Sequence, residues 1–280
     1  MKNSKPLQEK LKDLQQQKQA LLATNFYNFE TLKGILEAAR LTKKPIILQL
    51  TKSSIEYMGL SVALGLAETM LKDYEVEGWI HLDHGDSYEL AATCLDAGFS
   101  SVMIDASERS FDENVKITRR VVKFAEKYGA NVEAELGFVA KLGQKMDKAG
   151  FTGPAEARSF VEATGVNALA VAIGSAHGFY KEEPRLDLER LSEIHKVTNS
   201  ALVLHGASGI PHDVLREAIA RGICKINLAT EIKNIFMKTL KDKLATEDEI
   251  DLRKVFPRAT DAVTKLVQEK LLAIQTETMR

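Results

Sequence analysis

Eight short apolar segments recur along this 280-residue chain, and a longer stretch follows each of them. The apolar segments occupy residues 20–26, 45–50, 78–85, 101–107, 130–137, 168–174, 201–209 and 222–230. They read as mostly continuous apolar runs, which is typical of parallel strands covered on both faces. The stretches between them read as amphipathic helices; in residues 113–128, for example, Val115, Val122 and Phe124 lie near a 3.6-residue period. The alternation predicts a parallel sheet connected by helices.

Eight strand and helix units predict an α/β fold of the closed (β/α)8 type, a TIM barrel, because such barrels typically take roughly 250 residues. We expect one barrel domain over residues 1–280. An open doubly wound sheet is the alternative, but no GxGxxG motif follows the first strand, so its dinucleotide-binding form is disfavoured. Residues 1–19 and 260–276 predict extra helices at the N- and C-terminal ends. Residues 137–153 form a long connection, for which a lid and a plain surface loop are equally good interpretations.

Charge and cysteine content narrow the classes of function. The chain has 38 basic and 39 acidic residues and a formal net charge of -1, which gives no broad attraction to nucleic acid or to a membrane. Cys94 and Cys224 form neither a disulfide framework nor a CxxC motif. The N-terminal residues lack the apolar core of a signal peptide, and no run of about 18 apolar residues follows. We expect a cytoplasmic protein with no nucleic-acid or membrane partner.

Polar residues end most of the predicted strands. Active sites of (β/α)8 barrels lie at the carboxyl ends of the strands, so these residues are expected to converge on one mouth. Following the chain from the third predicted strand to the eighth, they are Asp83, His84, Asp105, Glu133, Glu135, His177, His205 and Asn227.

Three of the six histidines, His84, His177 and His205, fall at strand ends. Three imidazoles leave coordination positions open, as expected of a catalytic metal site. For any one of them a hydrogen-bonded histidine near a loop is an equally good interpretation, but the three together favour metal binding. The other histidines are given no role in the site: His81, His195 and His212.

Asp83 immediately precedes a predicted metal ligand. Adjacent side chains on a strand point to opposite faces, so Asp83 and His84 both reach the mouth only where the strand turns, and Gly85 suits such a turn. A carboxylate beside a dication can act as a general acid or base. It can also accept a hydrogen bond and orient a ligating histidine. The residues alone leave both roles open.

Glycines near the seventh predicted strand indicate a phosphate site. Gly206-Ala207-Ser208-Gly209 precedes a helix opened by Pro211, and Gly178 follows a predicted metal ligand. Backbone amides exposed in such loops bind anions, and a helix N-terminus adds a favourable potential. Glycines that serve only tight turns are the alternative interpretation.

At these positions the sequence resembles the class II fructose-bisphosphate and tagatose-bisphosphate aldolases. The resemblance runs from the third to the eighth predicted strand in the order of the family, with a further match in the first strand and helix. The matching segments are NFYNFETLKGILEAA at 25–39, HLDHG at 81–85, MIDAS at 103–107, VEAELG at 132–137, AVAIGSAHG at 170–178, LVLHGASGIP at 202–211 and KINLATE at 225–231.

The resemblance implies a role for each matching residue. It makes His84, His177 and His205 the ligands of a catalytic Zn²⁺ and makes Asp83 the catalytic residue that exchanges a proton with the aldehyde-side hydroxyl. Asp105 and Glu135 match positions that hold a second or displaced cation, divalent or monovalent. The residues expected to bind substrate are Gly178, Gly206, Ser208, Asn227 and Thr230, with Thr51 adding a hydroxyl.

The implied activity is that of a lyase. The resemblance implies zinc-dependent, reversible retro-aldol cleavage of a ketose 1,6-bisphosphate, fructose or tagatose, to dihydroxyacetone phosphate and glyceraldehyde 3-phosphate. It also implies a homodimer or a homotetramer, a choice that composition does not decide.

The chain departs from the family pattern in two places. Residues 138–150 contain no glutamate where the family carries an acidic proton carrier, and Asp147 is the only acid there. Ser107-Glu108-Arg109 replaces the serine-histidine pair frequent in the tagatose branch. An aldolase for another ketose 1-phosphate and a weakly catalytic, stabilising subunit of a larger aldolase therefore stay as alternatives. A metal-dependent hydrolase is disfavoured, because it would not need the phosphate segments.

Overall fold

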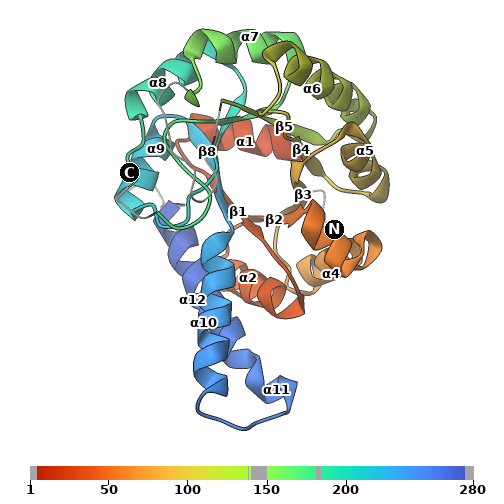
Figure 1. The fold of residues 1–280 in the computed structure, drawn as a ribbon, viewed down its shortest axis with the longest axis vertical. Helices are drawn as coiled ribbons and strands as arrows, with labels where there is room; N and C mark the ends of the chain where they lie inside the picture. The colour runs from red at the N-terminus through yellow and green to blue at the C-terminus, as the bar shows by residue number, and fades with distance from the viewer. Residues whose placement is uncertain (1–4, 138, 140–149, 181–183, 275–280) are drawn as a thin grey trace.

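Eight parallel strands close into a barrel in sequence order in the computed structural model, which describes residues 5–137, 139, 150–180 and 184–274. The predicted (β/α)8 fold is thereby confirmed (Figure 1). The strands are β1 (Leu21–Asn25), β2 (Ile46–Thr51), β3 (Gly78–Gly85), β4 (Ser101–Ile104), β5 (Asn131–Leu136), β6 (Ala168–Val171), β7 (Ala201–Leu204) and β8 (Ile223–Leu228).

The first of the described helices precedes β1, and most of the others follow a strand and cover the outside of the barrel. The helices are α1 (Leu7–Gln16), α2 (Phe29–Thr42), α3 (Lys52–Met58), α4 (Leu60–Asp73), α5 (Tyr88–Ala97), α6 (Phe111–Ala125), the 3-10 helix η1 (Glu126–Tyr128), α7 (Pro154–Thr164), α8 (Leu188–Val197), α9 (His212–Ala220), α10 (Thr230–Leu244), α11 (Leu252–Val255) and α12 (Pro257–Ile274).

Local sequence signals set where these helices begin and end. The helix predicted over 113–128 begins two residues earlier, because Ser110 and Glu113 form a capping box at the start of α6. Helix α5 ends where Gly98 adopts the left-handed conformation. The extra terminal helices predicted over 1–19 and 260–276 are α1 and α12. Most of the connection predicted over 137–153 lies outside the described residues.

Helix α1 closes the N-terminal end of the barrel. It buries Leu7, Leu11 and Leu14 against an apolar layer that includes Trp79 and Cys224. Figure 1 shows α1 crossing the barrel, and its contacts reach β5, β7 and β8. The predicted site residues lie at the opposite end of the barrel, where the strands end.

Helices α10, α11 and α12 form an arm that projects from the barrel (Figure 1). Helix α12 packs along α2, where a Cβ on Gly34 would lie 2.8 Å from the Thr260 carbonyl oxygen. The outer part of the arm exposes apolar side chains, with Ile250 at 91% and Leu252 at 60% relative exposure. Within the described ranges, no helix has both the length and the apolar character needed to cross a membrane.

Candidate active site

The end of β3 presents two adjacent polar side chains to the barrel mouth. His84 has a positive φ of 50°, and the pairing of β3 with β4 shifts register between Leu82 and Gly85. A Cβ on Gly85 would lie 2.5 Å from the Met103 carbonyl oxygen, so glycine lets the strand turn there. The turn brings Asp83 and His84 to within 4.0 Å of each other at the mouth, as the sequence predicted.

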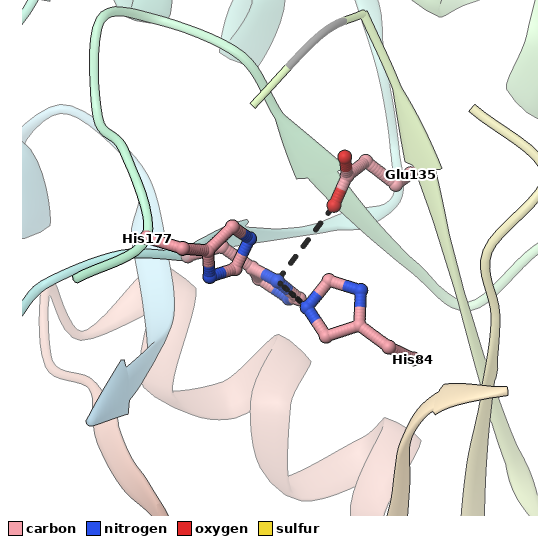
Figure 2. A group of neighbouring side chains, drawn as sticks. His84, Glu135 and His177 are labelled. Atoms are coloured by element: carbon pink, nitrogen blue, oxygen red, sulfur yellow. Dashed lines mark hydrogen bonds and ion pairs between the residues drawn. The ribbon is translucent and has the colours of Figure 1, made fainter. Parts of the chain in front are cut away.

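Three histidines and one glutamate converge at the centre of the mouth. One ligand atom from each of His84, Glu135, His177 and His205 can be chosen so that all four atoms lie within 4.8 Å of one another. Figure 2 shows His84, Glu135 and His177 pointing toward a common point. All three predicted histidine ligands are therefore brought together, and Glu135 joins them.

Carboxylates behind two of the histidines orient their rings. His84 Nδ1 lies 2.7 Å from Asp105 Oδ2, and His205 Nε2 lies 2.8 Å from Glu133 Oε1. With the carboxylates as acceptors, both ring protons point away from the centre of the mouth. His205 Nδ1 and His84 Nε2 then face each other across 3.1 Å, a separation at which one proton, or a cation in its place, lies between them. Such an arrangement suits a cation held between them.

Glu135 also fits a metal centre. Its Oε2 is buried and has no hydrogen-bond partner among the described residues. Burial and the neighbouring Asp105 carboxylate raise the pKa of Glu135 to about 8. Although burial opposes protonation of His84, the surrounding carboxylates of Asp83, Glu135 and Asp105 raise the pKa of that ring to about 9. The donor set and this concentration of negative charge fit a divalent cation.

Asp83 is buried and held by amide groups from three other strands. Its carboxylate accepts hydrogen bonds from Asn25 Nδ2 at 2.9 Å, Gln49 Nε2 at 3.2 Å and Asn227 Nδ2 at 3.4 Å. Burial raises the pKa of Asp83, but the nearby imidazoles of His84 and His205 outweigh it, and the net pKa is lowered. The carboxylate is therefore fixed in place and ionised at neutral pH, which is the form that can accept a proton.

Two clefts meet at His84 and His177. The smaller, of about 260 Å³, also contains Asp83 and every residue predicted to bind substrate: Thr51, Gly178, Gly206, Ser208, Asn227 and Thr230. The larger, of about 610 Å³, shares the two histidines and is otherwise lined by Asp86, Asp105, Ala106, Glu108 and Arg109. The site thus has room for a substrate with one half in each cleft.

Backbone conformation shapes the smaller cleft. Gly178 and Gly206 have positive φ angles of 100° and 69°, and a Cβ on Gly206 would collide with the backbone of Ala176. The Tyr180 hydroxyl accepts a hydrogen bond from Ala176 N and donates one to Gly206 O, each at 2.8 Å, which ties the two loops together. Ser208 Oγ accepts from Glu231 N at 3.4 Å, at the start of α10.

Lys233 lies in the smaller cleft, although sequence reasoning missed it. Its Nζ lies 5.5 Å from the centre of the Tyr27 ring. It follows Thr230 by three residues on α10, so the two share a helix face, and that spacing is the signal that could have revealed it. A cation in this cleft complements a phosphate group.

Other polar residues were missed because they lie inside strands. Asn25, Gln49 and Lys225 face the barrel interior with His81, which the sequence left without a role. The signal available was period two, since Gln49 and Lys225 each precede a predicted site residue by two positions.

The remaining histidines lie away from the cluster, and one predicted residue is not described. His195 lies within α8, and His212 begins α9, where its Nε2 lies 3.6 Å from Glu269 Oε1. Asp147, the one acid predicted in the connection after β5, lies outside the described residues.

Comparison with known proteins decides the family. The family model described as fructose-bisphosphate aldolase class-II matches residues 5–278. The chain belongs to this family. The resemblance predicted from the sequence is therefore confirmed, and the chain is an aldolase, a lyase of a family that is generally metal-dependent.

Similar proteins cover this aldolase almost from end to end. It is 38% identical over 279 residues to the fructose-bisphosphate aldolase of Helicobacter pylori strain 26695, covering 89% of this chain and 91% of that protein. It is 40% identical over 275 residues to the enzyme of the same name from Geobacillus stearothermophilus, covering 95% and 94%. The crystal structure of the YdjI aldolase from Escherichia coli K12 superimposes with a TM-score of 0.87, at 31% identity, over 97% of each chain.

Proposed function

We propose that this aldolase reversibly cleaves fructose 1,6-bisphosphate to dihydroxyacetone phosphate and glyceraldehyde 3-phosphate, using a bound Zn²⁺. The observation that carries the proposal is the placement of Asp83 beside the cluster of His84, His177 and His205, at the junction of the two clefts. Family membership, at 38–40% identity to fructose-bisphosphate aldolases, supports this substrate over tagatose 1,6-bisphosphate. We place the reaction in the cytoplasm.

The smaller cleft would hold the ketone half of the substrate. Its glycine-rich loops around Gly178 and Gly206 present backbone groups, and Ser208 and Thr230 add hydroxyls for the 1-phosphate. Lys233 adds a positive charge to the same cleft. Asn227 lies between Asp83 and His205, where it can hold the hydroxyl groups of the substrate near the metal centre.

Proton transfer would fall to Asp83. As the C3–C4 bond breaks, Asp83 accepts the proton of the C4 hydroxyl, C4 becomes the aldehyde carbon, and the electron pair of the broken bond moves onto C3 and the C2 oxygen. A divalent cation bound by the histidines would supply the charge that stabilises that oxygen. A proton delivered to C3 then completes dihydroxyacetone phosphate.

The larger cleft would receive the aldehyde half. Its lining includes Arg109, which can meet the 6-phosphate, whereas the carboxylate of Asp86 is paired with Lys52 at 2.7 Å. An Arg109→Met variant should raise KM for fructose 1,6-bisphosphate but not for fructose 1-phosphate, which lacks that phosphate. Equal effects on both substrates would show that Arg109 does not meet the 6-phosphate.

The test of the function compares cleavage of fructose 1,6-bisphosphate, tagatose 1,6-bisphosphate and fructose 1-phosphate by the zinc-loaded wild type and by a His84→Ala variant. We expect release of dihydroxyacetone phosphate that is fastest with fructose 1,6-bisphosphate, stops with a chelator and is lost in the variant. Zinc-loaded wild type that cleaves none of the three would refute the proposal. Faster cleavage of the tagatose substrate would reverse the assigned C4 stereochemistry.

A further inference from the structure

A fully buried ion pair spans the barrel interior beneath the metal centre. Lys225 of β8 and Glu133 of β5 each have 0% side-chain exposure, and Lys225 Nζ lies 2.7 Å from Glu133 Oε2. The two strands are not neighbours in the barrel, so the side chains meet across its interior. Burying two charges carries a large desolvation cost, and apolar side chains of the same volume often stabilise such a position as well or better. The pair therefore calls for a role beyond core packing.

Glu133 connects this pair to a predicted metal ligand. Its Oε2 is occupied by Lys225, and its Oε1 lies 2.8 Å from His205 Nε2. The carboxylate thus has one oxygen for each partner. With Oε1 as acceptor, the ring proton of His205 stays on Nε2, and the lone pair of Nδ1 faces His84 Nε2 at 3.1 Å and Glu135 at 3.7 Å.

Lys225 is itself held from a second side. Its Nζ lies 3.4 Å from His81 Nε2, and His81 Nδ1 lies 2.7 Å from Ser101 Oγ. Ser101 Oγ also accepts from Asn131 Nδ2 at 2.9 Å. All of these side chains are fully buried, so the ammonium group is confined between His81 and Glu133. A confined lysine fixes the plane of the carboxylate next to it.

We propose that Lys225 is a positioning residue for the metal centre, acting through Glu133 on the ring of His205. The inference rests on the metal centre of the proposed function, and it assigns a role that sequence reasoning gave to neither Lys225 nor Glu133. Without Lys225, the Glu133 carboxylate has lost its cationic partner and is free to rotate. The His205 ring is then no longer held with Nδ1 toward the other ligands.

The experiment measures metal affinity and not turnover. Co²⁺ is titrated into metal-free wild type and a Lys225→Met variant, with the visible absorption of the ion and a competing chelator as readouts. We expect roughly 10- to 100-fold weaker binding in Lys225→Met, with an altered cobalt spectrum, because loss of groups that orient metal ligands typically costs that much. Lys243→Met is the matched control, since Lys243 is also largely buried and paired with Glu247 at 2.6 Å, but lies on α10 in the arm. It should bind as the wild type does.

A double-mutant cycle tests whether Lys225 acts through Glu133. Glu133→Gln should weaken Co²⁺ binding, and adding Lys225→Met should weaken it little further, because the two residues form one path to His205. The double variant has lost both charges of the pair, so it leaves no unpaired charge in the core. Its Co²⁺ affinity can therefore be measured even where a single variant fails to fold. Wild-type affinity and spectrum in Lys225→Met or in the double variant, or losses that add, would overturn the inference. Wild type that binds no Co²⁺ would overturn the metal centre as well, whereas wild type that binds Co²⁺ without cleaving sugar phosphates would overturn only the proposed function.

Discussion

Asp83 illustrates how strongly single residues in this site depend on their neighbours. Its carboxylate sits between amide donors of β1, β2 and β8 and the imidazole of His84. The amides can hold the side chain but cannot accept a proton from it, so the capacity for proton transfer belongs to the carboxylate itself.

An Asp83→Asn variant separates the position of this side chain from its capacity to accept a proton. We expect kcat to fall by roughly 10²- to 10⁴-fold, the usual contribution of general acid-base catalysis, because asparagine accepts no proton. Zinc content should stay at the wild-type value, because the grouped ligand atoms come from other residues. Steady-state kinetics and metal analysis of the same sample check both points. An unchanged kcat would mean that another group takes the proton.

Lys233 should act on binding and leave the chemical step unchanged. Replacing it with methionine should raise KM for the sugar phosphate by roughly tenfold, near the lower end of what a charged hydrogen bond contributes, since the side chain is exposed. The matched control is Lys238→Met, an exposed lysine on the same helix that does not line the cleft. A fall in kcat without a change in KM would contradict this role.

The sequence allowed some residues of the site to be predicted and concealed others for a physical reason. His84, His177 and His205 could be found because each lies at or after the end of a strand, where the active sites of barrels are located. Lys225 and Gln49 lie within strands, and although each precedes a predicted site residue by two positions, that spacing does not show which residue the side chain meets across the barrel. Their importance arises from pairing across the barrel, which depends on strand register.

At the scale of elements, the turn at the end of β3 determines the geometry of the mouth. The left-handed conformation of His84 interrupts the regular alternation of side chains along the strand, so both side chains reach the mouth. Asp83 faces the interior amides there, and His84 faces the other histidines. The sequence indicated this turn through Gly85. It gave no sign of the register shift itself, which depends on contacts with β4.

Gly85→Ala tests that turn. The added methyl would lie 2.5 Å from Met103 O, so we expect a loss of about 1–3 kcal/mol in the free energy of unfolding, together with weaker metal binding as His84 moves. Gly65→Ala in α4 is the control, because its Cβ would meet nothing within 4 Å and alanine should stabilise the helix by up to about 1 kcal/mol. Denaturant unfolding of both variants provides the comparison. A Gly85→Ala variant that is as stable as the wild type would show that the turn tolerates a side chain.

Helix α1 should contribute stability without affecting the chemistry. Leu11 is fully buried at the closed end of the barrel, so Leu11→Ala should lower the free energy of unfolding by about 2–5 kcal/mol. The exposed neighbour Lys12→Ala serves as the control. At temperatures where the variant is folded, its kcat should match that of the wild type, because the mouth lies at the opposite end. A variant with normal stability would show that α1 is dispensable.

At the scale of the whole molecule, the candidate metal-binding residues come from four strands or their following loops. A bound ion would contact His84, Glu135, His177 and His205, and the hydrogen bond of His84 would link it to Asp105 after a fifth strand. The prediction of a single domain over residues 1–280 stays a prediction, and we propose that the chain unfolds as one unit in calorimetry.

Removing the metal should therefore destabilise the entire barrel. At a free Zn²⁺ concentration 100 times Kd, binding contributes about 2.7 kcal/mol, which corresponds to roughly 5 °C in Tm for a chain of 280 residues. A chelator should lower Tm by that amount in the wild type and in His212→Ala, whose histidine lies outside the cluster. His205→Ala should show a much smaller change. An equal effect of the chelator on all three proteins would place the stabilising ion elsewhere.

The projecting arm of α10, α11 and α12 also affects how the molecule diffuses. A 31.0 kDa barrel with this arm on one side has a larger frictional coefficient in solution than a sphere of equal mass. A single chain should therefore elute early from a sizing column and sediment slowly for its mass. An assembly in which each arm lies along a neighbouring barrel would recover a compact outline, so its frictional ratio would fall as its mass rises.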